Sequence, residues 1–177
     1  MQDYKVYIVI SQTGTVLSRV LKYVTGAPYN HSSISPYADL RLMYSFGRRN
    51  PYNPFWGGFV TESVRFGTFK RFRKTKAEVL ELSVTSEQYA ALCETLETMV
   101  RNREQYRYNY LGVCLAAFRI SHRKENRYYC SEFVKGLLER HAMVEEGALP
   151  AITQPIHFEG LPCAEPVFRG VLRDYAV

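Results

Sequence analysis

The sequence predicts a single α+β domain, in which an antiparallel sheet comes mostly from the first half of the chain and helices cluster in the second half. The chain has 177 residues, an ordinary length for one domain. Hydrophobic residues make up 46% and charged residues 23%, which is normal globular composition and argues against disorder. Runs rich in β-branched and aromatic residues precede the longest helical periodicities, which gives the expected order of elements.

The first strand is predicted at residues 4–10, YKVYIVI, a run rich in β-branched and aromatic residues. A turn follows, and residues 15–24 then carry apolar side chains at helical spacing, with Gly26 as a stop. Two further strands are predicted at residues 31–35 and 42–46. Because only a short turn separates these two strands, they are expected to form a hairpin.

Residues 50–58, NPYNPFWGG, are predicted to form a loop, since two prolines and two glycines do not suit the interior of a β-ladder. Tyr52 and Trp56 are expected to pack within this loop, with a place in the wall of a cleft as the alternative. Strands are expected again at residues 59–63 and 77–84.

The second half of the chain begins with a strong helix signal. Thr85 and Gln88 have the spacing of a capping box, and a single apolar stripe then runs as far as Arg101, formed by Tyr89, Leu92, Leu96, Met99 and Val100. A second helix is predicted at residues 110–118. Cys114 within it, and Cys93 beside the preceding stripe, are assigned to the core. The chain ends with PVFRGVLRDY, a predicted last strand.

The net charge of the chain is +6, and much of it comes from residues 65–76, RFGTFKRFRKTK. Phenylalanines interleaved with basic residues can contact phosphates and stack on bases. The favoured interpretation is a solvated edge strand, on which Lys and Arg discourage association between sheets. We therefore expect no nucleic-acid partner, and keep a basic nucleic-acid-binding domain as an alternative function.

The apolar run at the start of the chain, MQDYKVYIVISQTG, is short and carries Lys5, and it lacks the basic start and the small-residue cleavage site of a signal peptide. No segment has the roughly 18 apolar residues of a membrane span, so a soluble, cytoplasmic protein is expected. The four cysteines form neither a CxxC pair nor a dense framework, so we expect neither disulfides nor structural zinc.

Cys130, in NRYYCSEFVKGLLER, is the strongest candidate for a reactive residue. The apolar stripe of Phe133, Val134, Leu137 and Leu138 predicts a helix that begins near Cys130. Backbone N–H groups and the helix dipole at such a position favour a thiolate, and they can also bind a developing oxyanion. The alternative is a small apolar residue that packs at a helix start.

A thiolate nucleophile needs a base, which is usually histidine. His122 lies in a charged loop, His141 follows Arg140 at a helix end, and His157 lies in a proline-rich tail. His31 instead opens a predicted strand, where its side chain is held rigidly and can be aimed across a cleft. His31 is therefore the candidate base for Cys130.

The order of three segments adds to this argument: GAPYNHSSIS, the hairpin return LRLMYSFGR, and YYCSEFV at the start of a late helix. This order resembles the circularly permuted papain-like group of the NlpC/P60 superfamily, and most of all its YiiX-like members. In that group the histidine hairpin precedes the cysteine helix. The resemblance extends roughly from Tyr4 to Leu138 and implies one permuted papain-like domain over residues 1–177, with an antiparallel sheet packed against helices.

The resemblance implies catalytic roles for individual residues. Cys130 matches the nucleophile and His31 matches the general base. A third polar residue, on the strand after the histidine strand, orients the imidazole in the family; here that strand offers Tyr44 and Ser45. Ser45 is preferred because it falls best opposite His31 in the hairpin, although a hydroxyl has no charge to stabilise imidazolium. Glu62, in GGFVTES, is the alternative orienting acid.

For two further groups of residues the sequence suggests a position but no catalytic role. Glu132 is expected to point away from Cys130 and to interact with the helix dipole or an ion-pair partner. The family counterpart of SQTGT lies near the cleft, so Gln12, Thr13 or Gly14 either lines the pocket or forms a plain turn.

The resemblance implies a cysteine-dependent hydrolase of the peptidase or amidase type, which cleaves an amide or ester through a thioester; acyl transfer is the same chemistry with another acceptor. It implies no metal or organic cofactor. A peptide, a cell-wall fragment and a lipid-like molecule remain open as substrates, and the oligomeric state is open too. The alternative function is a catalytically idle papain-like domain that binds a ligand or partner, which a serine at the third position would favour.

Overall fold

A computed structural model describes residues 4–13, 26–50, 53–116, 118, 120–122 and 124–176 of the chain. Its strands form one eight-stranded sheet in the order β7-β6-β4-β3-β2-β1-β5-β8. All neighbouring strands are antiparallel except β6 and β7, which are parallel. The strands are β1 (Tyr4–Gln12), β2 (His31–Ser35), β3 (Met43–Asn50), β4 (Asn53–Glu62), β5 (Lys76–Val84), β6 (Arg107–Tyr108), β7 (Arg127–Tyr128) and β8 (Ala164–Val171).

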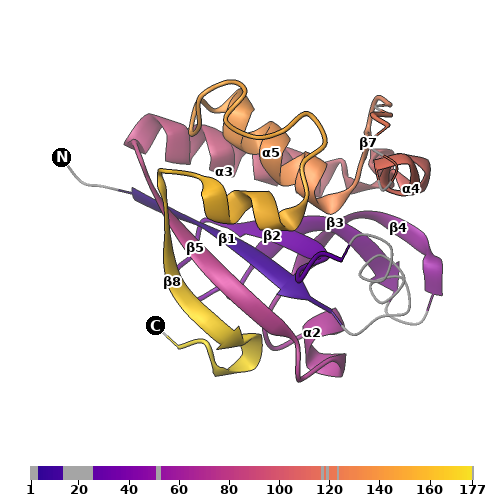
Figure 1. The fold of residues 1–177 in the computed structure, drawn as a ribbon, viewed down its shortest axis with the longest axis horizontal. Coiled ribbons are helices and arrows are strands. Elements are labelled where there is room, and N and C mark those ends of the chain that lie inside the picture. The colour runs from indigo at the N-terminus through magenta and orange to yellow at the C-terminus, as the bar shows by residue number, and fades with distance from the viewer. Residues whose placement is uncertain are drawn as a thin grey trace.

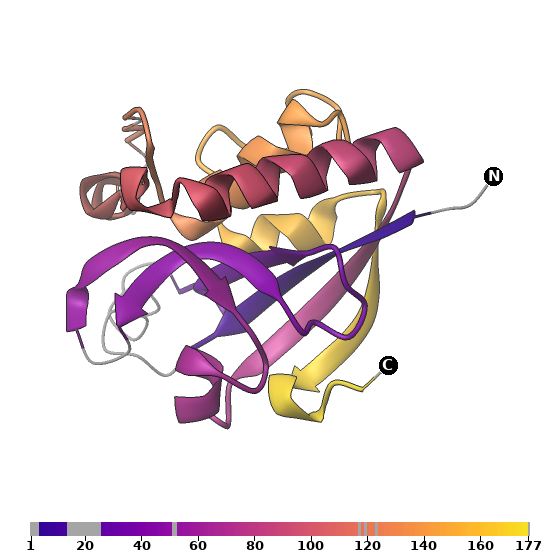
Figure 2. The same cartoon turned by 180° about the vertical axis from the view of Figure 1, so that it is seen from behind.

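Helices cover both faces of this sheet, unequally. On one face lie two long helices and a short 3₁₀ helix, α3 (Ser86–Arg101), α5 (Cys130–Arg140) and η2 (Pro155–Gly160), which run side by side above the strands (Figures 1 and 2). The remaining short elements are α2 (Gly67–Arg71), α4 (Tyr110–Ala116), η1 (Arg103–Gln105) and η3 (Leu172–Asp174). The described chain therefore has the α+β class that the sequence predicts, with a mixed sheet.

Two apolar clusters occupy the two faces, because side chains alternate along each strand. Ile8 and Ile10 of β1 point toward α3 and α5 and belong to the larger cluster with Phe133. Tyr7 and Val9 point the other way and pack with a smaller cluster, which includes Phe69 of α2 and Leu172 of η3. The elements α2 and η3 thus cover the second face at one end of the sheet.

Several local predictions are confirmed. The strand predicted at residues 31–35 is β2. The strands predicted at residues 4–10, 42–46 and 77–84 correspond to β1, β3 and β5, and each predicted start lies within two residues of the observed one. β1 and β3 extend further toward the C-terminus than predicted. Thr85 Oγ1 accepts a hydrogen bond from Gln88 N at 3.2 Å, and Gln88 Oε1 accepts one from Thr85 N at 2.9 Å, so the capping box is present. In the stripe of α3, Leu92, Leu96 and Met99 are buried but Val100 is exposed.

The loop predicted at residues 50–58 is wrong, because β4 begins at Asn53 and pairs with β3. A Cβ atom added to Gly57 would lie 2.6 Å from Tyr110 Oη, so this glycine permits a close approach to α4. Trp56 is 50% exposed, which does not fit the expected packing; Tyr52 lies outside the described residues. The predicted edge strand at residues 65–76 is also wrong, since residues 67–71 form α2.

Cys114 is exposed and Cys93 is half-buried, so the assignment of Cys114 to the core is wrong. Within α4, Gly112 is the residue that is fully buried, while Tyr110, Val113 and Ala116 pack against the larger apolar cluster and stay partly exposed. The helix predicted at residues 15–24 lies outside the described residues. Across the described part of the chain, no helix is long and apolar enough to cross a membrane.

A pair of glycines tests the packing of α4. A Cβ atom at Gly112 would lie 2.1 Å from Asn109 Nδ2, and Asn109 Oδ1 accepts a hydrogen bond from Gly112 N at 2.9 Å. We therefore expect Gly112→Ala to lower the free energy of unfolding by about 1–3 kcal/mol in urea denaturation, through overpacking. The matched control is Gly136→Ala in α5, where a Cβ atom meets open space and helix propensity should raise stability by up to about 1 kcal/mol. Equal effects of the two substitutions would contradict this packing.

Candidate active site

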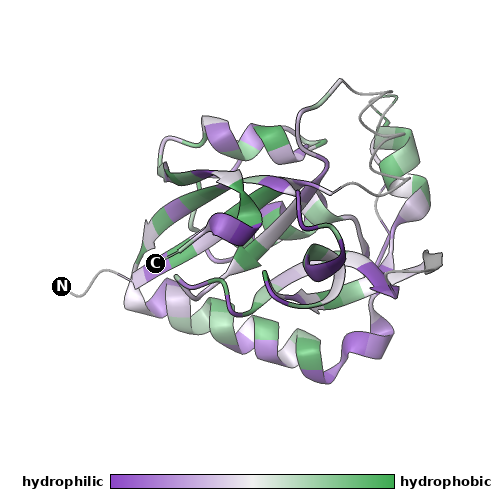
Figure 3. Cartoon of the chain, turned by 90° about the horizontal axis from the view of Figure 1, so that it is seen from below, coloured by the Kyte–Doolittle hydropathy of each residue, from purple (hydrophilic) through white to green (hydrophobic). Residues whose placement is uncertain are grey.

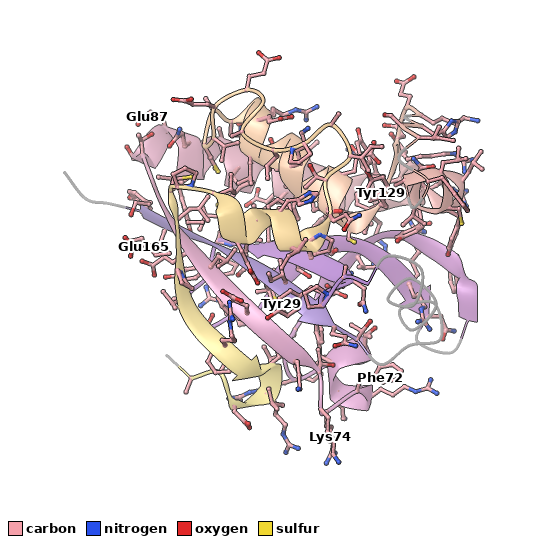
Figure 4. All side chains as sticks on the ribbon, in the orientation of Figure 1. Tyr29, Phe72, Lys74, Glu87, Tyr129 and Glu165 are labelled. Atoms are coloured by element: carbon pink, nitrogen blue, oxygen red, sulfur yellow. The ribbon has the colours of Figure 1, made fainter. Side chains whose placement is uncertain are left out.

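Cys130 is the first residue of α5, as predicted. Tyr129 before it is extended, with φ −101° and ψ 168°, so that the chain enters the helix directly from a strand-like segment (Figure 4). The stripe of Phe133, Val134, Leu137 and Leu138 is buried against the sheet. Cys130 is 5% exposed, which places the thiol at the rim of the core and not in its middle.

The start of α5 is held in place by the segment that precedes η2. Ser131 Oγ donates a hydrogen bond to Thr153 O at 2.6 Å. Lys135 Nζ, one turn further on, donates to Pro150 O at 2.8 Å. Glu132 accepts a hydrogen bond from Tyr129 N at 3.4 Å, so it acts on the helix terminus, in keeping with the expected dipole role. These contacts fix the position and direction of the cysteine.

His31 is the first residue of β2, and its ring contacts a carboxylate from β4. His31 Nε2 lies 2.9 Å from Glu62 Oε2 and 3.2 Å from Glu62 Oε1. The hydroxyl of Ser33, two residues further along the same face of β2, donates to Glu62 Oε2 at 2.7 Å. The side chains of His31 and Glu62 are 12% and 11% exposed, so this ion pair is almost fully buried.

The contact that was expected from Ser45 is therefore made by Glu62. The Ser45 hydroxyl donates to Ser32 O at 2.6 Å and is fully buried. Between β2 and β4 lies Gly47 of β3, where an added Cβ atom would lie 3.6 Å from His31 Cε1 and 3.9 Å from Glu62 Oε1. Because Gly47 has no side chain, the imidazole and the carboxylate meet across β3. Tyr44, the other candidate on β3, stacks on Phe59 in the core.

The side chains of Cys130 and His31 lie close enough for hydrogen bonding and charge to shift each other's pKa. Since Glu62 contacts Nε2 of the imidazole, Nδ1 is the nitrogen that remains for the sulfur. Backbone N–H groups of Ser32 and Ser131 also hydrogen-bond to the sulfur. These N–H groups favour the charged form of the sulfur, while Asn30 O, 4.0 Å from Sγ, can accept a hydrogen bond from the thiol form.

The three ionisable groups shift one another's pKa values. Burial by itself raises the pKa of Cys130, but the hydrogen bond and charge of His31, with the two backbone N–H groups, lower it below its ordinary value. Burial lowers the pKa of His31, but the charge of Glu62, the bond to Cys130 and the bond to Glu62 raise it to about 10. Burial raises the pKa of Glu62, and His31 and Ser33 lower it overall. The three shifts therefore all favour the charged forms, a thiolate beside an imidazolium that a carboxylate supports.

A recess of about 60 Å³ opens beside Cys130. Its walls are mostly apolar and come from the segment before β2, from α4 and from the segment before η2: Ala27, Tyr29, Val113, Ala116, Thr153, Gln154 and Pro155. Tyr29, labelled in Figure 4, donates a hydrogen bond to Glu78 Oε2 at 3.3 Å, which holds its ring. The recess is narrow and uncharged, which suits a small apolar group next to a reacting carbonyl.

The residues of SQTGT have different positions. Thr13 is buried, and its N and Oγ1 atoms lie 3.3 and 3.5 Å from Asn30 Oδ1. Thr13 therefore supports the residue before His31 and is not among the residues that line the recess. Gln12 ends β1 and is half-buried, and Gly14 lies outside the described residues.

Sequence reasoning did not find Ser33 or Gln154. Ser33 carried a usable signal, because residues i and i+2 of a strand share a face. Gln154 carried no such signal, since nothing in the nearby sequence links it to a helix start more than twenty residues earlier.

Among the described residues, no group of three His, Cys, Asp or Glu side chains could hold a metal ion. In comparisons with known proteins, no family model matches the chain and no curated protein matches it significantly.

The pKa shifts predict which thiol reacts at low pH. Cys130 should be alkylated by iodoacetamide at pH 6, well below the ordinary thiol pKa of about 8.5, because its pKa is lowered. Cys93 should react slowly there, because burial raises its pKa. Peptide mass spectrometry after timed labelling measures both rates, and equal rates for the two thiols would contradict the thiolate.

The same measurement separates Glu62 from Ser45. In Glu62→Gln the carboxylate charge is lost, so the pKa of His31 should fall, and the alkylation profile of Cys130 should move to higher pH by at least about one unit. Ser45→Ala should leave the profile unchanged, since its hydroxyl contacts a backbone carbonyl. A shift in Ser45→Ala without one in Glu62→Gln would overturn the assignment.

Proposed function

We propose that the protein is a cysteine-dependent hydrolase of the peptidase or amidase type, with Cys130 as nucleophile, His31 as acid and base, and Glu62 as the group that orients His31. The observation that carries the proposal is the buried chain of contacts from the sulfur through the imidazole to the Glu62 carboxylate. The order of the histidine hairpin and the cysteine helix also fits a permuted papain-like domain of the NlpC/P60 superfamily, of the YiiX-like kind.

The reaction follows from the charges. The Cys130 thiolate attacks the carbonyl carbon of an amide or ester, and the carbonyl oxygen becomes an oxyanion. His31 donates its Nδ1 proton to the leaving nitrogen or oxygen as the bond to carbon breaks, which leaves a thioester and a neutral imidazole. Water then attacks the thioester, His31 accepts a proton from it, and the acid product departs as the thiolate re-forms. An amine or alcohol in place of water would give acyl transfer.

Glu62 does two things in this scheme. Its contact with Nε2 fixes the tautomer and the ring orientation, so that Nδ1 faces the sulfur. Its negative charge stabilises the imidazolium while the thiolate is present. A catalytically idle binding domain was considered because a serine stood at the third position; with a carboxylate in contact with His31, that argument no longer applies.

The test is acylation by a model ester. We expect p-nitrophenyl acetate to give a burst of p-nitrophenolate and an acetyl group on Cys130, detected by mass spectrometry of the quenched enzyme. Cys130→Ala should abolish the burst, and His31→Ala should lower its rate by about 10²- to 10⁴-fold. Cys114→Ala is the matched control, since this thiol is exposed and lies outside the recess. Acetylation spread equally over the accessible cysteines would rule out the proposal.

Gln154 is the side chain of the recess best suited to bind the oxyanion, with the backbone N–H groups at the start of α5. We expect Gln154→Ala to lower the acylation rate by about 10²- to 10³-fold, the usual effect of losing one oxyanion donor. The alkylation profile of Cys130 should not change, because iodoacetamide alkylation forms no oxyanion. An unchanged acylation rate would exclude Gln154 from this role.

A further inference from the structure

Two adjoining pockets lie on the part of the molecule that carries α2. The first has a volume of about 670 Å³ and the second of about 440 Å³. They share Arg41, Ser63 and Phe66, so they form one continuous depression. Figure 3 shows α2 and the C-terminal turn η3 side by side on this face, both strongly hydrophilic. None of the residues that line the recess at Cys130 lines these pockets.

The depression, called the basic groove below, gathers cations from distant parts of the chain. Its basic residues are Arg41, Arg48, Arg49, Arg65, Lys70, Arg73, Arg103 and Arg173. Arg41 pairs with Asp39, and both Arg49 and Arg103 pair with Glu104. Within the described part of the chain, the other five side chains have no ion-pair partner. A face with this many unpaired cations is complementary to a polyanion.

The whole positive excess of the protein is found here. The chain has 23 Lys and Arg and 17 Asp and Glu. Without the eight cations of the basic groove and the two carboxylates that line it, Asp39 and Glu62, the rest of the chain has 15 residues of each sign. The basic groove is therefore a localised feature and not a consequence of a generally basic surface.

An aromatic ring stands in the middle of the basic groove. Phe66, immediately before α2, is 68% exposed and lines both pockets. A phenylalanine that is so exposed gains little from folding, but it offers a flat face to a planar ring. Cations that follow a groove, together with an exposed aromatic ring, are the two features by which proteins bind single strands of nucleic acid.

We propose that the basic groove binds single-stranded nucleic acid, with phosphates on its arginines and Lys70 and a base stacked on Phe66. Arginine suits this role, because its planar fork binds phosphate oxygens in pairs. The unpaired cations lie in long side chains spread over two pockets, which favours an extended strand over one compact anion. The concave shape is complementary to a strand and not to a flat anionic membrane.

The structure also removes the reason for expecting no nucleic-acid partner. That expectation treated residues 65–76 as an edge strand, whose charges would only prevent association of sheets. Those residues instead form α2 and its flanking turns; Phe72 and Lys74 lie at the edge of the molecule far from Glu87 of α3 (Figure 4). Arg41, Arg48 and Arg173, from other segments, complete the groove.

The experiment measures binding of a fluorescein-labelled 12-nucleotide oligouridylate by anisotropy between 50 and 200 mM salt. We expect the triple variant Arg65→Ala, Lys70→Ala, Arg73→Ala to weaken binding at least tenfold at 50 mM salt, and the slope of log K against log salt to flatten by about 2, since each lost phosphate contact contributes about 0.7. Phe66→Ala should weaken binding at least about fivefold, the lower end of the loss expected for one stacked base, and should leave the slope unchanged.

The matched control is the triple variant Lys124→Ala, Arg127→Ala, Arg140→Ala, which removes the same charge from exposed positions outside the basic groove. It should bind like wild type. An equal loss of binding in both triple variants, or no loss in Phe66→Ala, would overturn the proposal. So would equally tight binding of phosphatidylserine vesicles or of a polyglutamate peptide, which would identify a membrane or an acidic protein as the partner. The alkylation rate of Cys130 checks that each variant is folded, and it is independent of nucleic acid.

Discussion

The arrangement of the candidate site depends on the buried ion pair between His31 and Glu62. An ion pair with so little exposure is costly to desolvate, and it is stable only when its remaining hydrogen bonds are satisfied. Ser33 satisfies one oxygen of Glu62, and the thiol of Cys130 satisfies the other side of the imidazole. Gly47 of β3 lies between the two groups, and it has no side chain to separate the imidazole from the carboxylate. The lowered pKa of Cys130 depends on this pair, since a protonated imidazole beside the sulfur offsets the cost of burying a thiolate.

The two halves of the site come from opposite faces of the sheet. Cys130 belongs to a helix that packs on the larger apolar cluster, whereas His31 and Glu62 lie on the face of the smaller cluster, with the His31 ring 6.3 Å from that of Phe69. They meet because each is near the end of its element: Cys130 and His31 are the first residues of α5 and β2, and Glu62 is the last residue of β4. Residues at such ends lie at the edge of a layer, so their side chains can reach past that edge. The segment that binds Ser131 and Lys135 then holds the helix start in register with the strand.

The molecule has two candidate functional surfaces of different character. The recess at Cys130 is small and almost uncharged, while the basic groove beside α2 holds the chain's entire positive excess. Glu62 lines the basic groove on one side and contacts His31 on the other, so the two surfaces lie back to back. A ligand in the groove would approach the carboxylate of the site without entering the recess.

Structural features that depend only on residues close together in the chain could be predicted from the sequence alone. These include the strands β1, β2, β3 and β5, the capping box at Thr85, and the start of a helix at Cys130, because period, cap and β-propensity are local properties. The choice of His31 also came from its place at a strand start.

Features that depend on which distant segment of the chain packs against a given segment were decided only by the tertiary structure. The glycines after Trp56 belong to a strand because β4 pairs with β3. Cys114 is exposed because other residues of α4 face the core. The basic run forms part of a groove because distant arginines join it. Glu62, and not Ser45, contacts His31 because the pairing of β2, β3 and β4 brings the end of β4 beside the start of β2. That pairing is a property of the folded sheet, and no single segment of the sequence carries it.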